Sequence, residues 1–285
     1  MTREPGDRNS QGNGIRRISR YPAGLASASF ILLLAAVAIA GPLLYPGDPL
    51  AISEHTLLRP GGAYWLGTDD LGRDVLAELV YGVRVSLFVG VVAAFAATVA
   101  GTAVGAVAGF FGGWFDTVVM RIAEFFQVMP TFILAVVIVA LAGPGLTRVI
   151  AVIALLSWPQ TARVARGEVL RVSRLDFVDG ARCLGIPEWR ILFGEVLPNA
   201  IGPVIALGTL VVGYAILLEA SLSFLGLSSP DTVSWGRLLS VGQRFLLSAW
   251  WLSAFPGLAI FLTVLAFNLL GDTLGEMLNP RRSAN

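Results

Sequence analysis

Few side chains in this sequence could carry out chemistry. The chain has one histidine, His55, and one cysteine, Cys183, so it cannot form an internal disulfide or assemble a convincing catalytic set. The acidic run Asp69, Asp70 and Asp74 contains oxygen ligands that a divalent cation could use. No histidine cluster accompanies the run, and the start of a helix explains its first two members. We therefore expect no metal site, no cofactor and no enzymatic activity in this chain.

Charged residues inside apolar stretches offer a second kind of chemistry, because such residues commonly mark a solute pathway or an ion pair. Arg121 and Glu124 lie three residues apart, with Asp116 shortly before them. Residues at this spacing share one face of a helix. We therefore expect structural neutralisation of Arg121 by Glu124, with a role in a pathway as the alternative.

Glu219 is a separate case, since it has no basic neighbour within one helical turn. It lies toward the end of a long apolar stretch and is followed by Ser221 and Ser223. We expect it to pair with an arginine at the outer surface, Arg84 or Arg237, and so to close an outer gate. The alternative is that Glu219 contacts an amine of a transported substrate.

The longest polar segment between two apolar stretches runs from Ser173 to Asn199. We call residues 173–199 the knuckle. Its pattern predicts two short helices: Ser173 suits the N-cap of the first, and Gly185 suits the left-handed position that ends it. Pro187 suits the first turn of the second helix, and Pro198 is expected to stop it. A folded unit of this kind between two spans suggests that a partner binds it.

The composition places these elements in a membrane. The chain has 285 residues, of which 55% are hydrophobic and 14% charged, with a mean hydropathy of +0.75. We therefore expect an all-α polytopic protein, since about 20 apolar residues are needed to cross the hydrocarbon core. The fourth stretch contains Pro159, which predicts a break or kink. The six predicted spans are residues 24–45, 85–111, 118–142, 147–165, 200–226 and 249–271.

The distribution of arginines, which are the only basic residues besides His55, predicts the topology. They cluster before the first span, in the knuckle region and at the chain end, which the positive-inside rule places in the cytoplasm. The first span is too long for a signal peptide and is expected to stay uncleaved. The net charge of +1 gives no indication of a nucleic-acid partner. The cytoplasmic arginines are Arg3, Arg8, Arg16, Arg17, Arg20, Arg163, Arg166, Arg171, Arg174, Arg182, Arg190, Arg281 and Arg282.

The remaining organisation follows from local patterns. Residues 46–84 should form an outer segment with an interfacial helix capped by Thr68, and span two should pack closely through small residues such as Gly101 and Gly105. The expected divisions are a disordered cytoplasmic N-terminus (1–20), the first span with its outer segment (21–84), a core transmembrane domain (85–275) containing a coupling loop (171–199), and a cytoplasmic C-terminus (276–285).

Residues 179–198, DGARCLGIPEWRILFGEVLP, resemble the EAA loop of binding-protein-dependent ABC importer permeases. Three positions depart from that pattern: Asp179 replaces Glu, Gly180 replaces Ala and Glu195 replaces Ile. Further segments resemble the branch that carries dipeptides, oligopeptides and nickel. These segments are Trp65–Leu87, Leu218–Ser240 and Phe267–Arg282.

The resemblance implies a type I ABC importer of a bacterial or archaeal inner membrane. This chain would be the second permease of a heterodimer, working with two cytoplasmic ATPases, which bind ATP and Mg²⁺, and an extracytoplasmic substrate-binding protein. The chain itself has no lysine and so no Walker motif. The residues that the resemblance and the local pattern assign to ATPase coupling are Asp176, Phe177, Asp179, Gly180, Ala181, Arg182, Leu184, Gly185, Leu197 and Pro198.

Within the knuckle, Phe177, Ala181 and Leu184 recur at helical spacing and predict a small apolar stripe that seats in a groove of an ATPase. The alternative is an amphipathic helix on the inner leaflet. Outer segments 46–84 and 227–248 are expected to receive the binding protein. Peptides are the expected cargo, with nickel or another small solute as the alternative. A self-sufficient secondary transporter or channel is disfavoured, because three spans have almost no central charges.

Overall fold

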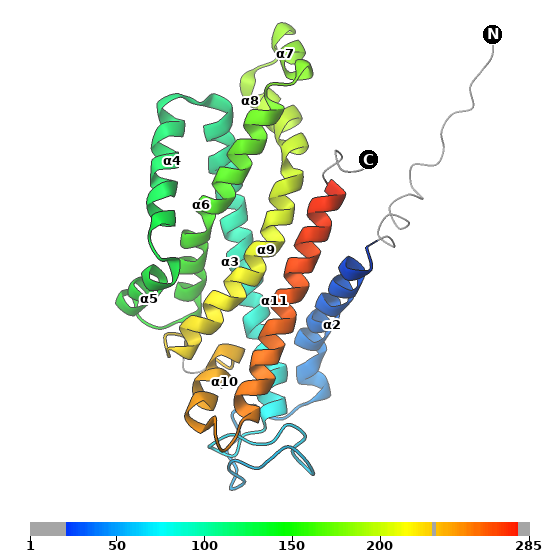
Figure 1. The fold of residues 1–285 in the computed structure, drawn as a ribbon, viewed down its shortest axis with the longest axis vertical. Helices are drawn as coiled ribbons and strands as arrows, with labels where there is room; N and C mark the ends of the chain where they lie inside the picture. The colour runs from blue at the N-terminus through cyan, green and yellow to red at the C-terminus, as the bar shows by residue number, and fades with distance from the viewer. Residues whose placement is uncertain (1–20, 230–231, 279–285) are drawn as a thin grey trace, which may run out of the picture.

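The computed structural model describes residues 21–229 and 232–278, and this part of the chain is helical with no β-strand. The predicted all-α class is therefore confirmed, while the predictions for residues 1–20 and 279–285 lie outside the described residues. Figure 1 shows an elongated bundle. Its elements are α2 (Pro22–Leu44), α3 (Val75–Phe111), α4 (Gly113–Val128), α5 (Thr131–Ala142), α6 (Leu146–Val172), α7 (Asp176–Cys183), α8 (Glu188–Ile191), a π-helical segment (Leu192–Val196), α9 (Leu197–Phe224), α10 (Trp235–Gly242), a 3₁₀ turn (Gln243–Phe245) and α11 (Trp251–Leu278).

Four helical segments are long and apolar enough to cross a membrane: α2, α3, the continuous segment Glu188–Phe224 and α11. The pair α4 and α5, which is bent by 91°, gives a fifth if it is taken as one broken span. Helix α6 has 27 residues but is more polar, so the predicted count of six spans stays a prediction. Pro159 does not break this helix, which continues through it to Val172.

Helix α3 joins two elements that the sequence pattern separated. The predicted interfacial helix and the second span form one helix of 37 residues. Thr68 does not cap it: its hydroxyl is buried and donates to the His55 carbonyl. The N-cap is Asp74, whose Oδ1 accepts a hydrogen bond from the Leu76 N–H at 2.9 Å. Gly72, with φ of 73°, turns the chain between Thr68 and this cap, which explains why the earlier position is not used.

The small residues of α3 allow it to pack directly on the backbone of α6. A Cβ added to Gly101 would lie 2.6 Å from the Trp158 carbonyl oxygen, and one added to Gly105 would lie 2.2 Å from that of Ala162. The predicted close approach through small residues is confirmed, and the partner is α6. This contact fixes the helix that leads into the knuckle.

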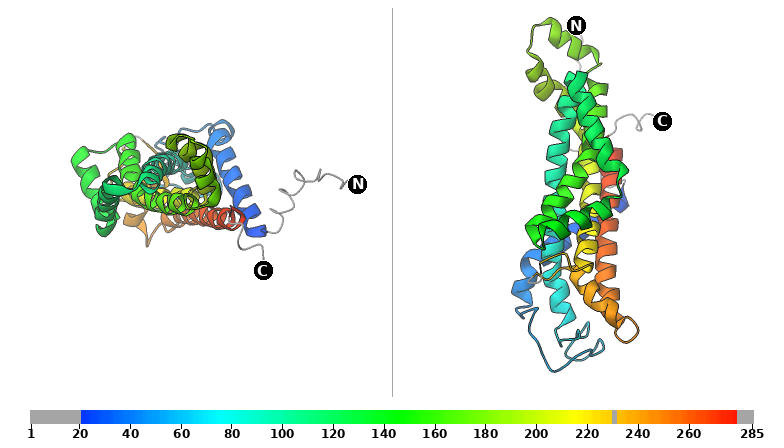
Figure 2. Two further views of the ribbon diagram at one scale, coloured as in Figure 1. Left: turned by 90° about the horizontal axis from the view of Figure 1, so that it is seen from above. Right: turned by 90° about the vertical axis from the view of Figure 1, so that its left-hand side faces the viewer.

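The two ends of the molecule carry different structures. Figure 1 shows α7 and α8 projecting at one end, with the segment that precedes α3 and helix α10 at the opposite end. Figure 2 shows the same separation from a perpendicular direction. The knuckle and the predicted outer segments therefore lie at opposite ends of the bundle.

Candidate functional site

Helix α7 of the knuckle starts after Leu175, which has an extended backbone. The prediction that Ser173 caps this helix is wrong. Its hydroxyl donates to the Val169 carbonyl at 2.7 Å, and Ser173 forms the C-cap of α6. A hydroxyl one turn beyond a helical carbonyl commonly bonds back in this way. The turn from α6 into α7 is thus short and closely tied to α6.

The end of α7 is a Schellman motif centred on Gly185. Gly185 has φ of 74° and its N–H donates to the Arg182 carbonyl at 2.9 Å. The Ile186 N–H donates to the Ala181 carbonyl at 3.2 Å. These two bonds are the ones that define the motif, and the predicted left-handed glycine is confirmed. Pro187 then precedes α8 as its N-cap.

One face of the knuckle packs against the ends of α3 and α6. The side chains of Val178, Ile191 and Leu192 are fully buried, in a cluster that includes Ala106 of α3 and Val169 of α6. This cluster gives the knuckle an apolar core that belongs to the rest of the bundle. Its position is therefore set by packing as well as by its two connections.

The predicted apolar stripe on α7 is wrong for one of its three members. Phe177 and Leu184 are exposed, but Ala181 is only 9% exposed and belongs to the buried cluster. The helical spacing predicted that all three side chains share one exposed face, but Ala181 lies on the buried side of its edge. Two large exposed side chains were missed, Trp189 and Phe193. Their positions beside Arg190 and Gly194 in a polar region were the available signal.

Arg182 ties the parts of the knuckle together. Its Nη1 lies 3.0 Å from Asp179 Oδ1, and its Nε lies 3.3 Å from Glu188 Oε1. Its guanidinium also lies over the ring of Phe110, 5.8 Å from the centroid. Arg182 therefore contacts α7, α8 and the end of α3 at once, and these contacts stabilise the conformation of the knuckle.

The remaining α7 positions are open to solvent. Asp176, Asp179 and Gly180 are exposed. Apart from its chain neighbours and the nearby backbone of α7, no described atom lies within 4 Å of a Cβ added to Gly180. This glycine is therefore not required by close packing, although it departs from the alanine of the EAA pattern.

Pro198 does not stop the second helix of the knuckle. Helix α8 continues through the π-helical segment Leu192–Val196 into α9, where Pro198 lies in the first turn. The Leu197 N–H bonds to the Leu192 carbonyl, five residues back. In a regular α-helix, the proline ring would clash with the carbonyl four residues back, and its missing N–H would leave that carbonyl without a donor. The wider π turn before Pro198 avoids both problems. The knuckle is thus continuous with a membrane span.

Near the opposite end, Glu219 is buried and bonded to serines. Ser223 donates to its Oε1 at 2.6 Å, and Ser86 of α3 lies within 3.4 Å of its Oε2. The expected ion pair with an outer arginine is not formed within the described residues: Arg84 is exposed, and Arg237 donates to the Thr232 carbonyl. Hydroxyls within reach on α3 and α9 satisfy the carboxyl group. Ser221 faces away and bonds to the Leu217 carbonyl.

The acidic run before α3 is used by the backbone. Asp69 is 1% exposed and accepts hydrogen bonds from the N–H groups of Leu71 and Arg73, at 2.8 and 2.7 Å. Burial raises the pKa of the Asp69 carboxyl. Asp74 caps α3 and also accepts a hydrogen bond from the Tyr45 hydroxyl, which raises the pKa of Tyr45 to about 12. These contacts join the end of α2 to the start of α3.

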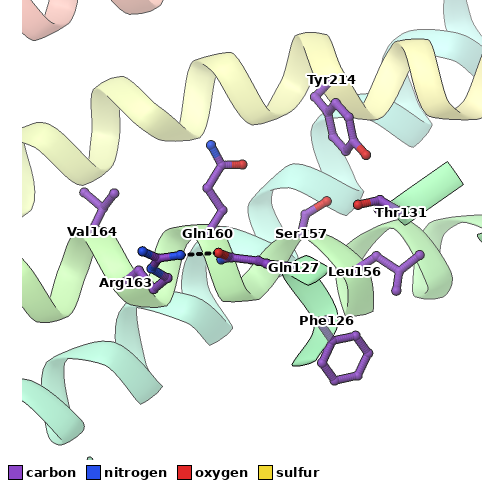
Figure 3. Close-up of a pocket in the computed structure, with 9 residues that line it drawn as sticks. All are labelled: Phe126, Gln127, Thr131, Leu156, Ser157, Gln160, Arg163, Val164 and Tyr214. Atoms are coloured by element: carbon purple, nitrogen blue, oxygen red, sulfur yellow. Dashed lines mark hydrogen bonds between the residues drawn. The ribbon is translucent and has the colours of Figure 1, made fainter. Parts of the chain in front are cut away.

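A cavity of about 630 Å³ lies between α4, α5, α6 and α9. Figure 3 shows Tyr214 reaching from α9 toward Ser157 and Thr131, with Arg163 hydrogen-bonded to Gln127. No sequence motif marks this cavity, because its residues come from four helices. Its lining residues are Phe126, Gln127, Thr131, Leu156, Ser157, Gln160, Arg163, Val164 and Tyr214.

A second cavity of about 460 Å³ shares Arg163 with the first and is lined by α4 and α6. The predicted pair of Arg121 and Glu124 is confirmed at 3.0 Å. Asp116 pairs instead with Arg166 of α6, a contact that sequence spacing could not reveal because the two lie 50 residues apart. The two cavities together follow the groove between α4 and α6.

Comparison with known proteins adds independent evidence. The family described as binding-protein-dependent transport system inner membrane component matches residues 101–284. The chain is 38% identical to the glutathione transport system permease protein GsiD of Pectobacterium atrosepticum over 269 residues, covering 93% of this chain and 89% of that protein. It is 39% identical to the GsiD proteins of Escherichia coli and Shigella sonnei, with the same coverage.

The family match covers the knuckle and every described helix from α4 onward. The matched proteins are transport permeases, which agrees with the apolar helices of this chain. The chain therefore belongs to the family of binding-protein-dependent transport system inner membrane components, as a multi-pass permease of an ABC importer of the peptide and nickel branch.

Proposed function

We propose that this permease imports small peptides, and that a cytoplasmic ATPase drives it through the knuckle. The observation that carries the proposal is the knuckle itself, a tied helical unit that projects from one end of the bundle and continues into a span. The peptide cargo is supported by the relatives, which are named as glutathione transport permeases. Glutathione is a tripeptide.

The exposed face of the knuckle has the composition of a docking surface. Phe177, Leu184, Trp189 and Phe193 expose large apolar side chains next to Asp176 and Asp179. Aromatic anchors with charges around them are characteristic of protein interfaces. An ATPase groove that received these anchors would move with the knuckle when ATP closes the ATPase pair.

The rest of the assembly follows from this assignment. The path would be completed by a second permease, two ATPases would bind ATP and Mg²⁺, and a substrate-binding protein would deliver cargo at the opposite end. Residues 46–84 and 227–248 are the surfaces proposed to receive it. The knuckle and both chain termini would then be cytoplasmic, and Glu219 with its serines would hold the outer end of the path closed.

The test combines co-purification with transport. Phe177→Ala and Trp189→Ala truncate exposed anchors and should weaken recovery of the ATPase with the permease and lower peptide uptake. Phe95→Ala is a matched control, because Phe95 is a similarly exposed aromatic on α3, away from the knuckle. Normal ATPase recovery and normal uptake in both knuckle variants would contradict the docking site. If the intact system takes up no peptide, the proposal that peptides are the cargo is wrong.

A further inference from the structure

Three arginines along the groove between α4 and α6 differ in whether a carboxylate of the described residues forms an ion pair with them. Arg121 pairs with Glu124, and Arg166 pairs with Asp116. Arg163 lines both of the cavities described above. Within the described residues, its hydrogen bond goes to the neutral amide oxygen of Gln127, and no carboxylate forms an ion pair with it. The charge of Arg163 is therefore left available to a ligand.

The larger cavity supplies further hydrogen-bond donors around this charge. Gln160 lies one turn before Arg163 on α6 and lines the cavity together with Ser157. The Ser157 hydroxyl is buried, and it has no hydrogen-bond partner among the described residues. A buried polar group without a partner is costly, which suggests that another molecule satisfies it. Thr131 and Tyr214 add hydroxyl groups from α5 and α9.

The lining has one sign of charge. It includes one arginine and several amides and hydroxyls, and no acidic residue belongs to the described lining of the larger cavity. A guanidinium with neighbouring donors matches a carboxylate, which accepts two parallel hydrogen bonds. A cationic solute would meet only repulsion from Arg163.

We propose that this cavity is an anion subsite of the translocation path, in which Arg163, Gln160 and Ser157 hold the terminal carboxylate of a peptide in transit. This subsite rests on the proposed function, because the group that it would bind is the carboxylate of an imported peptide. Gln127 holds the guanidinium of Arg163 in position through their hydrogen bond.

The first test measures the electrostatic preference of the cavity without any cargo. In the intact complex, Cys183→Ser removes the exposed native thiol and Gln160→Cys places one in the cavity. An anionic sulfonatoethyl methanethiosulfonate should modify this thiol faster than a cationic trimethylammonium reagent, by about fivefold after correction for their rates with a free thiol. Adding Arg163→Gln should abolish the preference. Arg171→Gln, which removes an arginine of α6 that pairs with Glu168 outside the cavity, should leave it intact.

The second test uses transport in proteoliposomes. Arg163→Gln should lower ATP-dependent uptake of glutathione by about tenfold, the effect of one lost charge-assisted hydrogen bond, and Arg163→Lys should restore part of it. Binding-protein-stimulated ATP hydrolysis should stay near that of the unmodified complex, which separates loss of a subsite from loss of folding.

The outcomes separate the two proposals. If the thiol reacts equally with both reagents, or if Arg171→Gln has the same effect as Arg163→Gln, the anion subsite is wrong even when peptides are imported. If glutathione is imported and Arg163→Gln leaves its uptake unchanged, the subsite is likewise wrong. If the unmodified complex imports no peptide, the proposed cargo fails, and the reagent comparison still decides whether the cavity selects anions.

Discussion

Arg166 of α6 donates hydrogen bonds to both carboxylate oxygens of Asp116 on α4: its Nη2 lies 2.6 Å from Oδ2, and its Nε donates to Oδ1. Among the side chains of α4, only Val119 and Ala123 are buried. This ion pair therefore fastens the start of α4 to the helix that leads into the knuckle. The geometry is the two-point arrangement that makes arginine–carboxylate pairs specific.

Removing one partner of this pair should loosen α4. Asp116→Asn leaves the guanidinium of Arg166 without its charge partner and should lower the free energy of unfolding by about 2 kcal/mol. The measurement is thermal unfolding of the purified complex. The exchanged pair Asp116→Arg with Arg166→Asp should recover part of the loss. Equal stability of the single variant and the unmodified protein would contradict this role.

Gly180 lies inside α7, and Gly185 lies just beyond its C-terminal end. Gly180→Ala adds a methyl group into open space inside α7 and should stabilise that helix by about 1 kcal/mol. Gly185→Ala places a side chain at a φ of 74° and should destabilise the knuckle by about 1 kcal/mol. Hydrogen exchange of residues 176–188 should slow in the first variant and quicken in the second. Changes in the same direction would show that the Schellman motif does not control the knuckle.

Arg182 should matter for rigidity more than for direct docking, because its charge is already engaged by Asp179 and Glu188. Arg182→Gln should quicken hydrogen exchange across α7 and α8 and uncouple ATP hydrolysis from uptake. Arg174→Gln is the control, since no carboxylate of the described residues forms an ion pair with this neighbouring arginine, whereas Arg182 has two. If both variants give the same exchange rates, the proposed tie between the two helices is absent.

The contact between Tyr45 and Asp74 predicts a dependence on high pH. Since Asp74 raises the pKa of Tyr45 to about 12 from 10.0, the folded state favours the neutral phenol. This contribution to stability is fully present below pH 10 and disappears as the pH rises through about 12. The tyrosinate absorbance difference between the unmodified protein and Tyr45→Phe should titrate near 12. Asp74→Asn should move that midpoint toward 10 while preserving the helix cap.

Glu219 should affect transport without selecting among substrates, because it is fully buried away from the cavities. Glu219→Gln should change the uptake of different peptides by the same factor. Glu219→Leu removes the acceptor of the Ser223 and Ser86 hydroxyls and should cost about 1–3 kcal/mol in stability. A loss of uptake confined to one class of peptide would restore the alternative in which Glu219 contacts cargo.

Features that local sequence determines were predicted well. The left-handed Gly185, the pairing of Arg121 with Glu124 and the small-residue face of α3 all depend on spacing within one element. The helical class followed from the apolar stretches. Each of these depends on short-range sterics or on periodicity, which one sequence displays directly.

Features that depend on distant partners were missed or misassigned. Ala181 belongs to the core because α3 and α6 end beside it, and Glu219 is satisfied by Ser86 from another helix. The cavity is built from four helices, so its residues share no motif. Thr68 failed as a cap because a turn at Gly72 delays α3 until Asp74. Tertiary contacts decided all of these positions.

The passage of α8 into α9 through a π turn has a mechanical consequence. The helix from Glu188 to Phe224 contains 37 residues, and so forms a rod about 55 Å long with no loop to absorb strain. Trp189 lies near one tip of this rod, and Glu219 lies near the other. The π-helical turn at Leu192–Val196 interrupts the regular α-helical hydrogen bonding of this segment close to the knuckle. Because the segment is continuous, we expect a displacement of the knuckle to move the opposite end of the same helix directly.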